Sequence, residues 1–136
     1  MALEQTLIVI KPDGFRRHLT GRILTRFEEK GLQIKNLTSF NFTIEKAQEF
    51  YGLHRDKSFF NELVKFISTG QVVACILEGA NAIAVVRLMI GTTKSFEAVP
   101  GTIRGDFGLG ITDNVIHASD SYESFIKESR VIFDWT

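Results

Sequence analysis

The feature that most constrains the fold is a short uninterrupted apolar run near the N-terminus, Thr6-Leu7-Ile8-Val9-Ile10. A short run rich in β-branched residues is typical of a strand covered on both faces, and hence of a central strand in a layered sheet. Lys11-Pro12-Asp13-Gly14 follows at once and predicts a polar turn. The run is also far too short to cross a membrane.

Helices and further strands alternate after this run. Thr20 is a plausible N-cap of a helix that ends at Gly31, and Ile23, Leu24 and Phe27 form its apolar stripe. Residues 32–42 alternate between apolar and polar, which predicts a half-buried strand. The remaining expected elements are helices over 44–51 (capped by Thr43), 59–68, 80–90 and 121–130, and strands over 72–77 and 114–118. Residues 92–113 show little periodicity and are expected to be a long, functional loop.

The order of these elements indicates the fold class. When the helices between residues 44 and 68 are set aside as an insertion, the pattern is βαββαβ. It predicts an α/β (α+β) fold of the ferredoxin-like type, a sandwich in which helices pack on a four-stranded antiparallel sheet. We expect one domain over residues 1–136, since no linker or repeat divides the 136-residue chain. This fold alone assigns no function.

Composition limits the kinds of partner. Sixteen Lys and Arg balance sixteen Asp and Glu, so any anion site must be local and not a general polyanion surface. The one cysteine, Cys75, excludes a disulfide framework and a multi-cysteine zinc site, and its apolar surroundings predict a buried, inert thiol. The N-terminus lacks the basic region of a signal peptide, so we expect a cytoplasmic protein without a membrane partner.

Several standard motifs are absent. Gly91-Thr92-Thr93-Lys94-Ser95 has the wrong spacing for a phosphate-binding loop, and it follows an expected helix where such a loop follows a strand. His18, His54 and His117 lie too far apart to suggest a metal cage. The aromatic signature of RNA-recognition domains is missing from residues 72–79, so we expect no stable nucleic-acid partner.

A set of polar residues at the ends of elements remains, namely Lys11, Arg87, Thr93, Arg104 and His117. We expect them to converge on one cleft at the strand termini. Two guanidinium groups, an ammonium group and a hydroxyl are the donors that a polyphosphate needs. A neutral imidazole beside them can attack phosphorus and form a phosphohistidine, which divides the transfer between two anions into two steps.

Each candidate also has a structural interpretation, which stays open on pattern alone. Lys11 and Arg104 are singly more often solvated loop charges, and Arg87 is more often an interface residue. Phe59 is more often part of a core than a stacking platform, and Tyr51 is evenly divided between the two roles. His117 caps a strand end about as often as it catalyses.

Three stretches resemble one family. Asn114-Val115-Ile116-His117-Ala118-Ser119-Asp120-Ser121 is similar to the active-site signature Asn-x-x-His-(Gly/Ala)-Ser-Asp of nucleoside diphosphate kinases. Thr6-Leu7-Ile8-Val9-Ile10-Lys11-Pro12-Asp13-Gly14 resembles the family's first strand and turn, and Pro100-Gly101-Thr102-Ile103-Arg104-Gly105-Asp106-Phe107 resembles its loop signature. The three occur in family order over nearly the whole chain.

The resemblance implies transfer of the γ-phosphate from a nucleoside triphosphate, typically ATP, to a nucleoside diphosphate by a ping-pong route, with Mg2+ on the phosphates. It implies that His117 is the nucleophile, that Glu128 bonds its other ring nitrogen, and that Ser119 supports that carboxylate. The remaining implied roles are Arg87, Thr93 and Arg104 on phosphate oxygens, Lys11 and Tyr51 near the transferred group, Asn114 and Lys11 on the sugar hydroxyl, and Phe59 stacked on the base.

The chain departs from the family pattern in three places. Lys94-Ser95 stands where the family has Asn/Asp-Pro, and Ser58 stands where it commonly has proline. The sequence ends at Trp135-Thr136, where many relatives continue through a tail that contacts neighbouring subunits. The family implies a homo-oligomer, a tetramer or hexamer built from dimers. The competing hypotheses are a non-catalytic nucleotide-binding regulatory module on the same fold and a nucleic-acid-binding ferredoxin-like domain.

Overall fold

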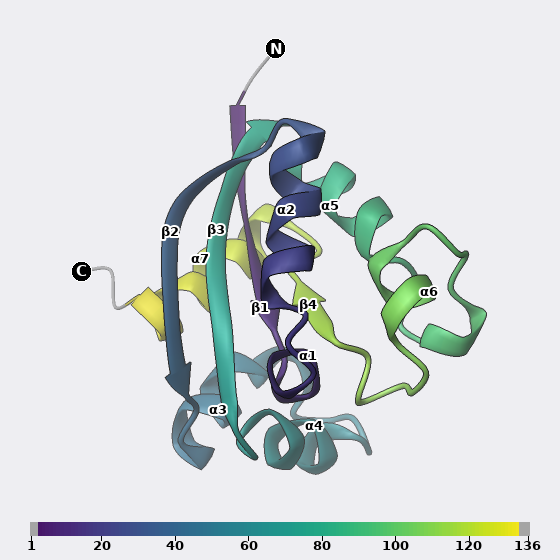
Figure 1. The fold of residues 1–136 in the computed structure, drawn as a ribbon. Helices are drawn as coiled ribbons and strands as arrows, with labels where there is room; N and C mark the ends of the chain where they lie inside the picture. Colours follow the sequence, from purple (N-terminus) through teal and green to yellow (C-terminus); the bar gives the residue numbers. More distant parts are fainter. Residues whose placement is uncertain (1–2, 134–136) are drawn as a thin grey trace.

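The computed structural model describes residues 3–133. Its elements are, in chain order, β1 (Leu3–Ile10), α1 (Pro12–Arg16), α2 (Thr20–Lys30), β2 (Gln33–Asn41), α3 (Ile44–Phe50), η1 (Gly52–His54), α4 (Phe60–Ile67), β3 (Gln71–Ala80), α5 (Ala82–Ile90), η2 (Ser95–Glu97), α6 (Ile103–Phe107), β4 (Ile116–Ala118) and α7 (Tyr122–Phe133). Within these residues the strands form one sheet in the order β2-β3-β1-β4, and every neighbouring pair is antiparallel (Figure 1). The predicted ferredoxin-like sandwich is confirmed.

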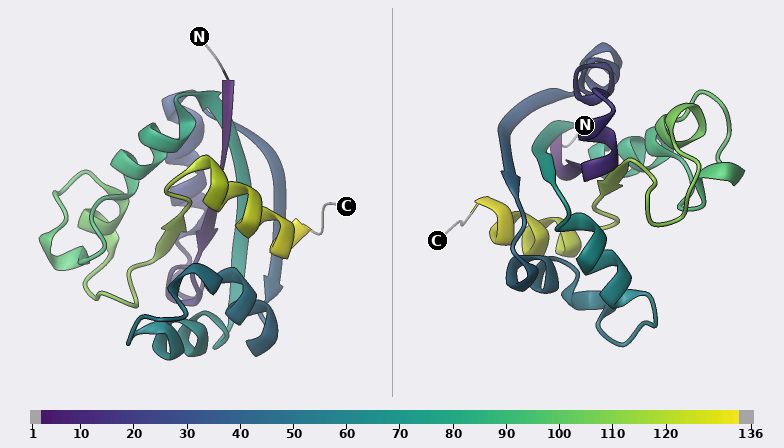
Figure 2. Two further views of the ribbon diagram at one scale, coloured as in Figure 1. Left: turned by 180° about the vertical axis from the view of Figure 1, so that it is seen from behind. Right: turned by 60° about the horizontal axis from the view of Figure 1, so that its bottom comes forward.

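Helices cover both faces of the sheet. Helices α2 and α5 pack on one face, and α3 and α7 pack on the opposite face with α4 beside α3 (Figures 1 and 2). Alternate residues of β1 therefore point into two separate cores, Ile8 and Ile10 into the first and Leu7 and Val9 into the second. All four are fully buried, which confirms the prediction of a central strand.

Two of the predicted helix ends are confirmed. The Thr43 side chain accepts a hydrogen bond from the backbone N–H of Lys46 and caps α3. Gly31 ends α2 with a φ of 105°, in the left-handed region that glycine adopts without a steric cost. Along β2 the burial alternates residue by residue, as the period-two pattern predicts.

The prediction for residues 11–20 is wrong in two details. Residues 12–16 form the helix α1 and not a turn, because Pro12 at the first helical position has a φ already suited to a helix. Thr20 does not cap α2, since the N-cap residue is Leu19 and α1 leads almost directly into α2. The backbone N–H of Leu19 donates to the Gly14 carbonyl, which fixes this tight connection.

Three other predicted boundaries also differ. Strand β3 continues to Ala80, so α5 begins only at Ala82, after Asn81 in a left-handed conformation. Residues 92–113 contain η2 and α6, which were missed because such short helices carry no apolar periodicity. Strand β4 begins at Ile116 and not at residue 114, because Val115 has a φ of 76° and cannot continue a strand.

Two further observations bear on the sequence-based expectations. Cys75 is fully buried in β3, and burial raises the pKa of its thiol to about 12, so it is an unreactive core residue. In residues 3–133 we find no helix with the length and apolar character needed to span a membrane.

Candidate active site

His117 lies on the edge strand β4, opposite Val9 of β1, and its side chain is 17% exposed. Its Nε2 lies 2.8 Å from Glu128 Oε1, and the hydroxyl of Ser119 donates to the same oxygen at 2.7 Å. Glu128 reaches this position because α7 packs against β1 and turns its buried face to the sheet. A carboxylate at Nε2 favours the tautomer with its proton there, which leaves a lone pair on Nδ1. Within residues 3–133, Nδ1 has no hydrogen-bond partner.

Two aromatic side chains at the end of α3 contact the imidazole. The ring of Phe50 is 4.9 Å from that of His117, and the ring of Tyr51 is 6.1 Å away at 89°. The Tyr51 hydroxyl is buried without a partner in the described chain, and burial raises its pKa above the ordinary range. It is therefore a protonated hydroxyl whose hydrogen-bond donor has no partner among the described residues.

Sequence reasoning missed His54 as a site residue. Its ring lies 6.2 Å from that of Tyr51, and its buried Nδ1 has no partner among the described residues. Burial, with the neighbouring charge of Lys57, lowers the pKa of His54, so the ring is neutral near pH 7. The available signal was its position three residues after Tyr51, which places both side chains on one side of a helical turn.

Two guanidinium groups bond to the backbone of the residues next to His117. Arg87 of α5 is half-buried and donates to the carbonyl of Ala118 at 3.1 Å. Arg104 of α6 is 4% exposed and donates to the carbonyls of Ile116, Asn114 and Gly91. Burial, with the nearby charge of Arg87, lowers the pKa of Arg104 to about 10, so it remains charged. The two arginines thus bond to the backbone carbonyls of Ala118 and Ile116, the residues next to His117 in β4.

Lys11 and Asn114 connect the end of β1 to the long loop. The Lys11 ammonium donates to Asn114 Oδ1 at 2.9 Å and to the Thr112 carbonyl at 3.2 Å. Asn114 in turn donates to the carbonyl of Thr93 at 3.0 Å, although the Thr93 side chain is in an exposed segment. Lys11 is 4% exposed, and burial together with Arg104 lowers its pKa to about 7. Hydrogen bonds thus link Lys11 to Asn114, and Asn114 to the Thr93 backbone and to Arg104.

Phe59 is the one aromatic candidate that stands apart from the imidazole. It precedes α4, is 43% exposed, and has its ring 6.0 Å from that of His54. Its side chain is therefore too exposed to be a core residue, and it lies next to His54.

Val115, two residues before His117, has a strained backbone conformation with a φ of 76°. The backbone N–H of Val115 donates to Asp13 Oδ2 at 3.0 Å, and its carbonyl accepts from the backbone N–H of Lys11 at 2.8 Å. Burial raises the pKa of Asp13. A β-branched residue with positive φ costs about 1–3 kcal/mol, so these contacts with α1 keep Val115 in place. Gly14 of α1 packs closely here, since a Cβ on it would lie 2.9 Å from Ile10 Cγ2 and 3.1 Å from the Val115 carbonyl oxygen.

Arg26 of α2 holds the loop that carries Arg104. It forms an ion pair with Asp106 at 2.6 Å, donates to the Gly101 carbonyl at 3.3 Å and lies over the ring of Phe107. Asp106 also accepts from the backbone N–H of Gly101, and these two bonds lower its pKa. The short helix α6 is therefore fixed to α2 by polar contacts.

Residues 3–133 contain no group of three or more His, Cys, Asp or Glu side chains placed to hold a metal ion. The donors around His117 are mostly cations and N–H or O–H groups, which suit an anion and would repel a bare divalent ion.

The fold and the site together define a ferredoxin-like α/β protein with a histidine–carboxylate pair beside a set of anion-binding donors. A family model described as nucleoside diphosphate kinase matches residues 4–136. The nucleoside diphosphate kinase of Staphylothermus marinus is 57% identical, covering 98% of this chain and 94% of that protein, and the one of Hyperthermus butylicus is 56% identical with the same coverage.

Solved structures agree with the sequence comparison. A crystal form of the Aquifex aeolicus nucleoside diphosphate kinase matches with a TM-score of 0.94 and 50% identity, covering 97% of this chain and 96% of that one. The Halobacterium salinarum enzyme in complex with CDP also has a TM-score of 0.94, at 42% identity, covering 98% of this chain and 90% of that one. The chain belongs to the nucleoside diphosphate kinase family and is a phosphotransferase that acts on nucleotides.

Proposed function

We propose that the protein transfers the γ-phosphate of a nucleoside triphosphate, typically ATP, to a nucleoside diphosphate through a phosphohistidine at His117. The observation that carries this proposal is the pairing of His117 Nε2 with Glu128 at 2.8 Å, because it leaves the Nδ1 lone pair free for attack. That the chain is 42% identical to a relative solved with CDP supports a nucleotide as the ligand.

The reaction has two balanced half-steps. In the first, Nδ1 forms a bond to the γ-phosphorus, the bond between that phosphorus and the β,γ-bridging oxygen breaks, and the nucleoside diphosphate leaves with the bridging oxygen. The imidazole becomes positively charged and keeps its Nε2 proton, and the Glu128 carboxylate stabilises this charge. In the second, a β-phosphate oxygen of the acceptor attacks phosphorus and the nitrogen–phosphorus bond breaks. Ser119 holds Glu128 in place throughout through its 2.7 Å bond.

The other candidates act by binding and charge stabilisation. Transfer of a phosphoryl group depends mainly on positioning and on donors aimed at the oxygens that gain charge. Arg104 uses three N–H groups on backbone carbonyls and keeps two for phosphate oxygens. The proposed roles of the others are Arg87 and Thr93 on phosphate oxygens, Tyr51 and Lys11 beside the transferred group, Asn114 with Lys11 on the sugar hydroxyl, and Phe59 under the base.

Mg2+ is the proposed cofactor, and it neutralises charge on the phosphates when it is bound with the nucleotide. No carboxylate cluster of the described chain competes for it. His54 is a further proposed hydrogen-bond donor to the phosphates, since its unpartnered nitrogen lies beside Tyr51 and its ring lies near Lys57 and His117.

We also propose that one domain spans residues 1–136, that it acts in the cytoplasm, and that it assembles into a tetramer or hexamer of dimers. Four large apolar side chains on and after α5 support an assembly, because contact with another copy would remove their surface from water (Leu88, Phe96, Val99 and Leu109 are each 60–81% exposed). Light scattering on the purified chain tests this part, and a monomer at micromolar concentration would contradict it.

The test of the reaction is direct. Incubation with γ-labelled ATP and Mg2+ should give a phosphoenzyme that is labile to acid, stable to alkali, and able to pass its label to an added nucleoside diphosphate. His117→Ala should form none and should have lost transfer activity. Transfer at the wild-type rate by this variant would disprove the proposal.

A further inference from the structure

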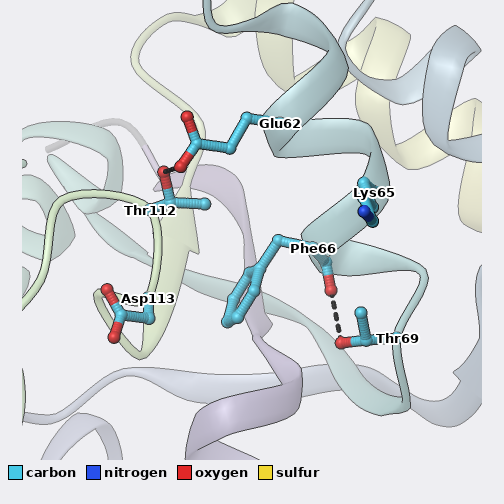
Figure 3. A pocket seen from close by; sticks show the side chains of 6 residues that line it. All are labelled: Glu62, Lys65, Phe66, Thr69, Thr112 and Asp113. Atoms are coloured by element: carbon cyan, nitrogen blue, oxygen red, sulfur yellow. Dashed lines mark hydrogen bonds between the residues drawn. The ribbon is translucent and has the colours of Figure 1, made fainter.

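A hydrogen bond crosses from α4 to the loop that precedes β4. Thr112 Oγ1 donates to Glu62 Oε1 at 3.2 Å (Figure 3). Glu62 lies in the first turn of α4, while the buried residues of this helix, Val64 and Ile67, face the core beside α3. The bond therefore joins the outer face of α4 to a segment on the opposite side of a gap.

The gap under this bond is hollow. A cavity of about 380 Å³ lies between α4 and the loop, and its walls are Glu62, Lys65, Phe66, Thr69, Thr112 and Asp113 (Figure 3). The two walls are thus not fixed to each other by close apolar packing at this place, which gives the hydrogen bond more influence on their separation.

Thr112 is held on both sides. Its hydroxyl bonds to Glu62, and its carbonyl accepts from the ammonium of Lys11 at 3.2 Å. Lys11 is buried at the end of β1 and also bonds to Asn114. A short chain of bonds, Glu62 to Thr112 to Lys11, consequently connects α4 to the central strand of the sheet.

Phe59 is coupled to the same turn of α4. Its carbonyl accepts from the backbone N–H of Leu63 at 3.0 Å, so it moves with the helix. Phe59 caps α4, and Glu62 lies three residues further on, about 4.5 Å along the helix axis. Ile111, which precedes Thr112, is 49% exposed, as Phe59 is 43% exposed.

We infer that Glu62 and Thr112 are positioning residues that set the distance between the base platform, Phe59, and the phosphate-side lysine, Lys11. The inference rests on the proposed function, since it requires a nucleotide whose base meets Phe59 while its phosphates reach Lys11. With the bond in place, Phe59 and Lys11 are already at the separation that the nucleotide requires before it binds. Less of the binding energy is then lost in ordering α4. A ligand with phosphates and no base gains nothing from this arrangement.

The test compares two ligands, ADP and inorganic diphosphate, by equilibrium titration in the presence of Mg2+. Glu62→Ala and Thr112→Val should each weaken ADP binding about fivefold, the equivalent of about 1 kcal/mol for one hydrogen bond, and leave diphosphate binding unchanged. The double variant should bind ADP no more weakly than either single variant. Glu62→Gln should bind like the wild type, because its amide oxygen still accepts from Thr112. Glu45→Ala is the matched control, since Glu45 is an exposed glutamate in the first turn of α3.

The variant Phe59→Ala distinguishes a failure of this inference from a failure of the proposed function. If Phe59→Ala leaves the preference for ADP over diphosphate unchanged, the base platform is wrong and the inference fails with it. If Phe59→Ala removes that preference while Glu62→Ala and Thr112→Val keep it, only the inference is wrong. Equal weakening of both ligands, or additive effects in the double variant, would also overturn it, because either outcome indicates general damage to the site.

Discussion

Replacing Lys11 with methionine should make the protein more stable at neutral pH and far less active. Lys11 is 4% exposed, and burial, followed by the charge of Arg104, lowers its pKa from 10.5 to about 7. Between these two values the unfolded chain binds more protons at this residue than the folded chain does. The free energy of unfolding of the wild type therefore rises with pH across this window, by at most about 1.4 kcal/mol per pH unit.

The size of the effect at pH 7 follows from two opposing contributions. Burial of the charge costs the folded state up to about 5 kcal/mol relative to water, by the same conversion. Methionine removes that cost, but it leaves Asn114 Oδ1 and the Thr112 carbonyl without their donor, at about 1.5 kcal/mol each. We expect a net gain of about 2 kcal/mol at pH 7. Turnover should fall sharply, because the ammonium is proposed to act beside the transferred phosphate.

Urea unfolding at pH 7, 8 and 9 measures this directly. The control is Lys30→Met, which changes an exposed lysine in the last turn of α2. The wild type and Lys30→Met should gain stability together as the pH rises, while Lys11→Met should start higher and stay flat. Parallel curves for the wild type and Lys11→Met would refute the reasoning, since Lys11 would then carry an ordinary pKa in the folded protein.

Three further changes test other parts of the structure. Glu128→Gln should slow phosphoenzyme formation about tenfold, because a neutral partner stabilises the charged imidazole less well, and it should leave nucleotide binding intact. Rapid-quench kinetics measure the rate and titration measures the binding, and equal losses in both would contradict this role. Arg26→Met should lower kcat/KM at low salt. The difference in kcat/KM from the wild type should shrink at high salt, because the ion pair with Asp106 is partly exposed and salt screens it. A defect independent of salt would argue against the pair as the cause. Ile23→Ala should cost about 3 kcal/mol in urea unfolding, since the side chain is fully buried on the core-facing side of α2. A loss below about 1 kcal/mol would show that the core collapses to fill the space.

The sequence predicted the framework well because local patterns determine it. The apolar run of β1, the alternation along β2 and the glycine that ends α2 are each explained by neighbouring residues alone. The helix α6 was missed because its stability is not determined by local patterns alone. This five-residue helix is stabilised by its Thr102 cap and by Arg26 from another helix. Tertiary contacts of this kind leave no periodic signal in the chain.

The candidate site was predicted as a set of residues, and the structure adds how each is held. Lys11 and His117 lie near each other because β1 and β4 are neighbours, which the order of elements already implied. The three backbone carbonyls bound by Arg104 could not be foreseen, since they lie on segments whose paths no local pattern determines. The left-handed conformation of Val115 could not be predicted either, because contacts with Asp13 and Lys11 hold it.

The close packing of Gly14 has a consequence for mutational scanning. A side chain at position 14 would push on Ile10 and on the carbonyl of Val115, two residues before His117. A saturation screen that selects for growth or activity will therefore score Gly14 among the least tolerant positions, with a profile similar to that of a catalytic residue. Such a map, taken without coordinates, would assign chemistry to a residue whose contribution is the space that it leaves empty.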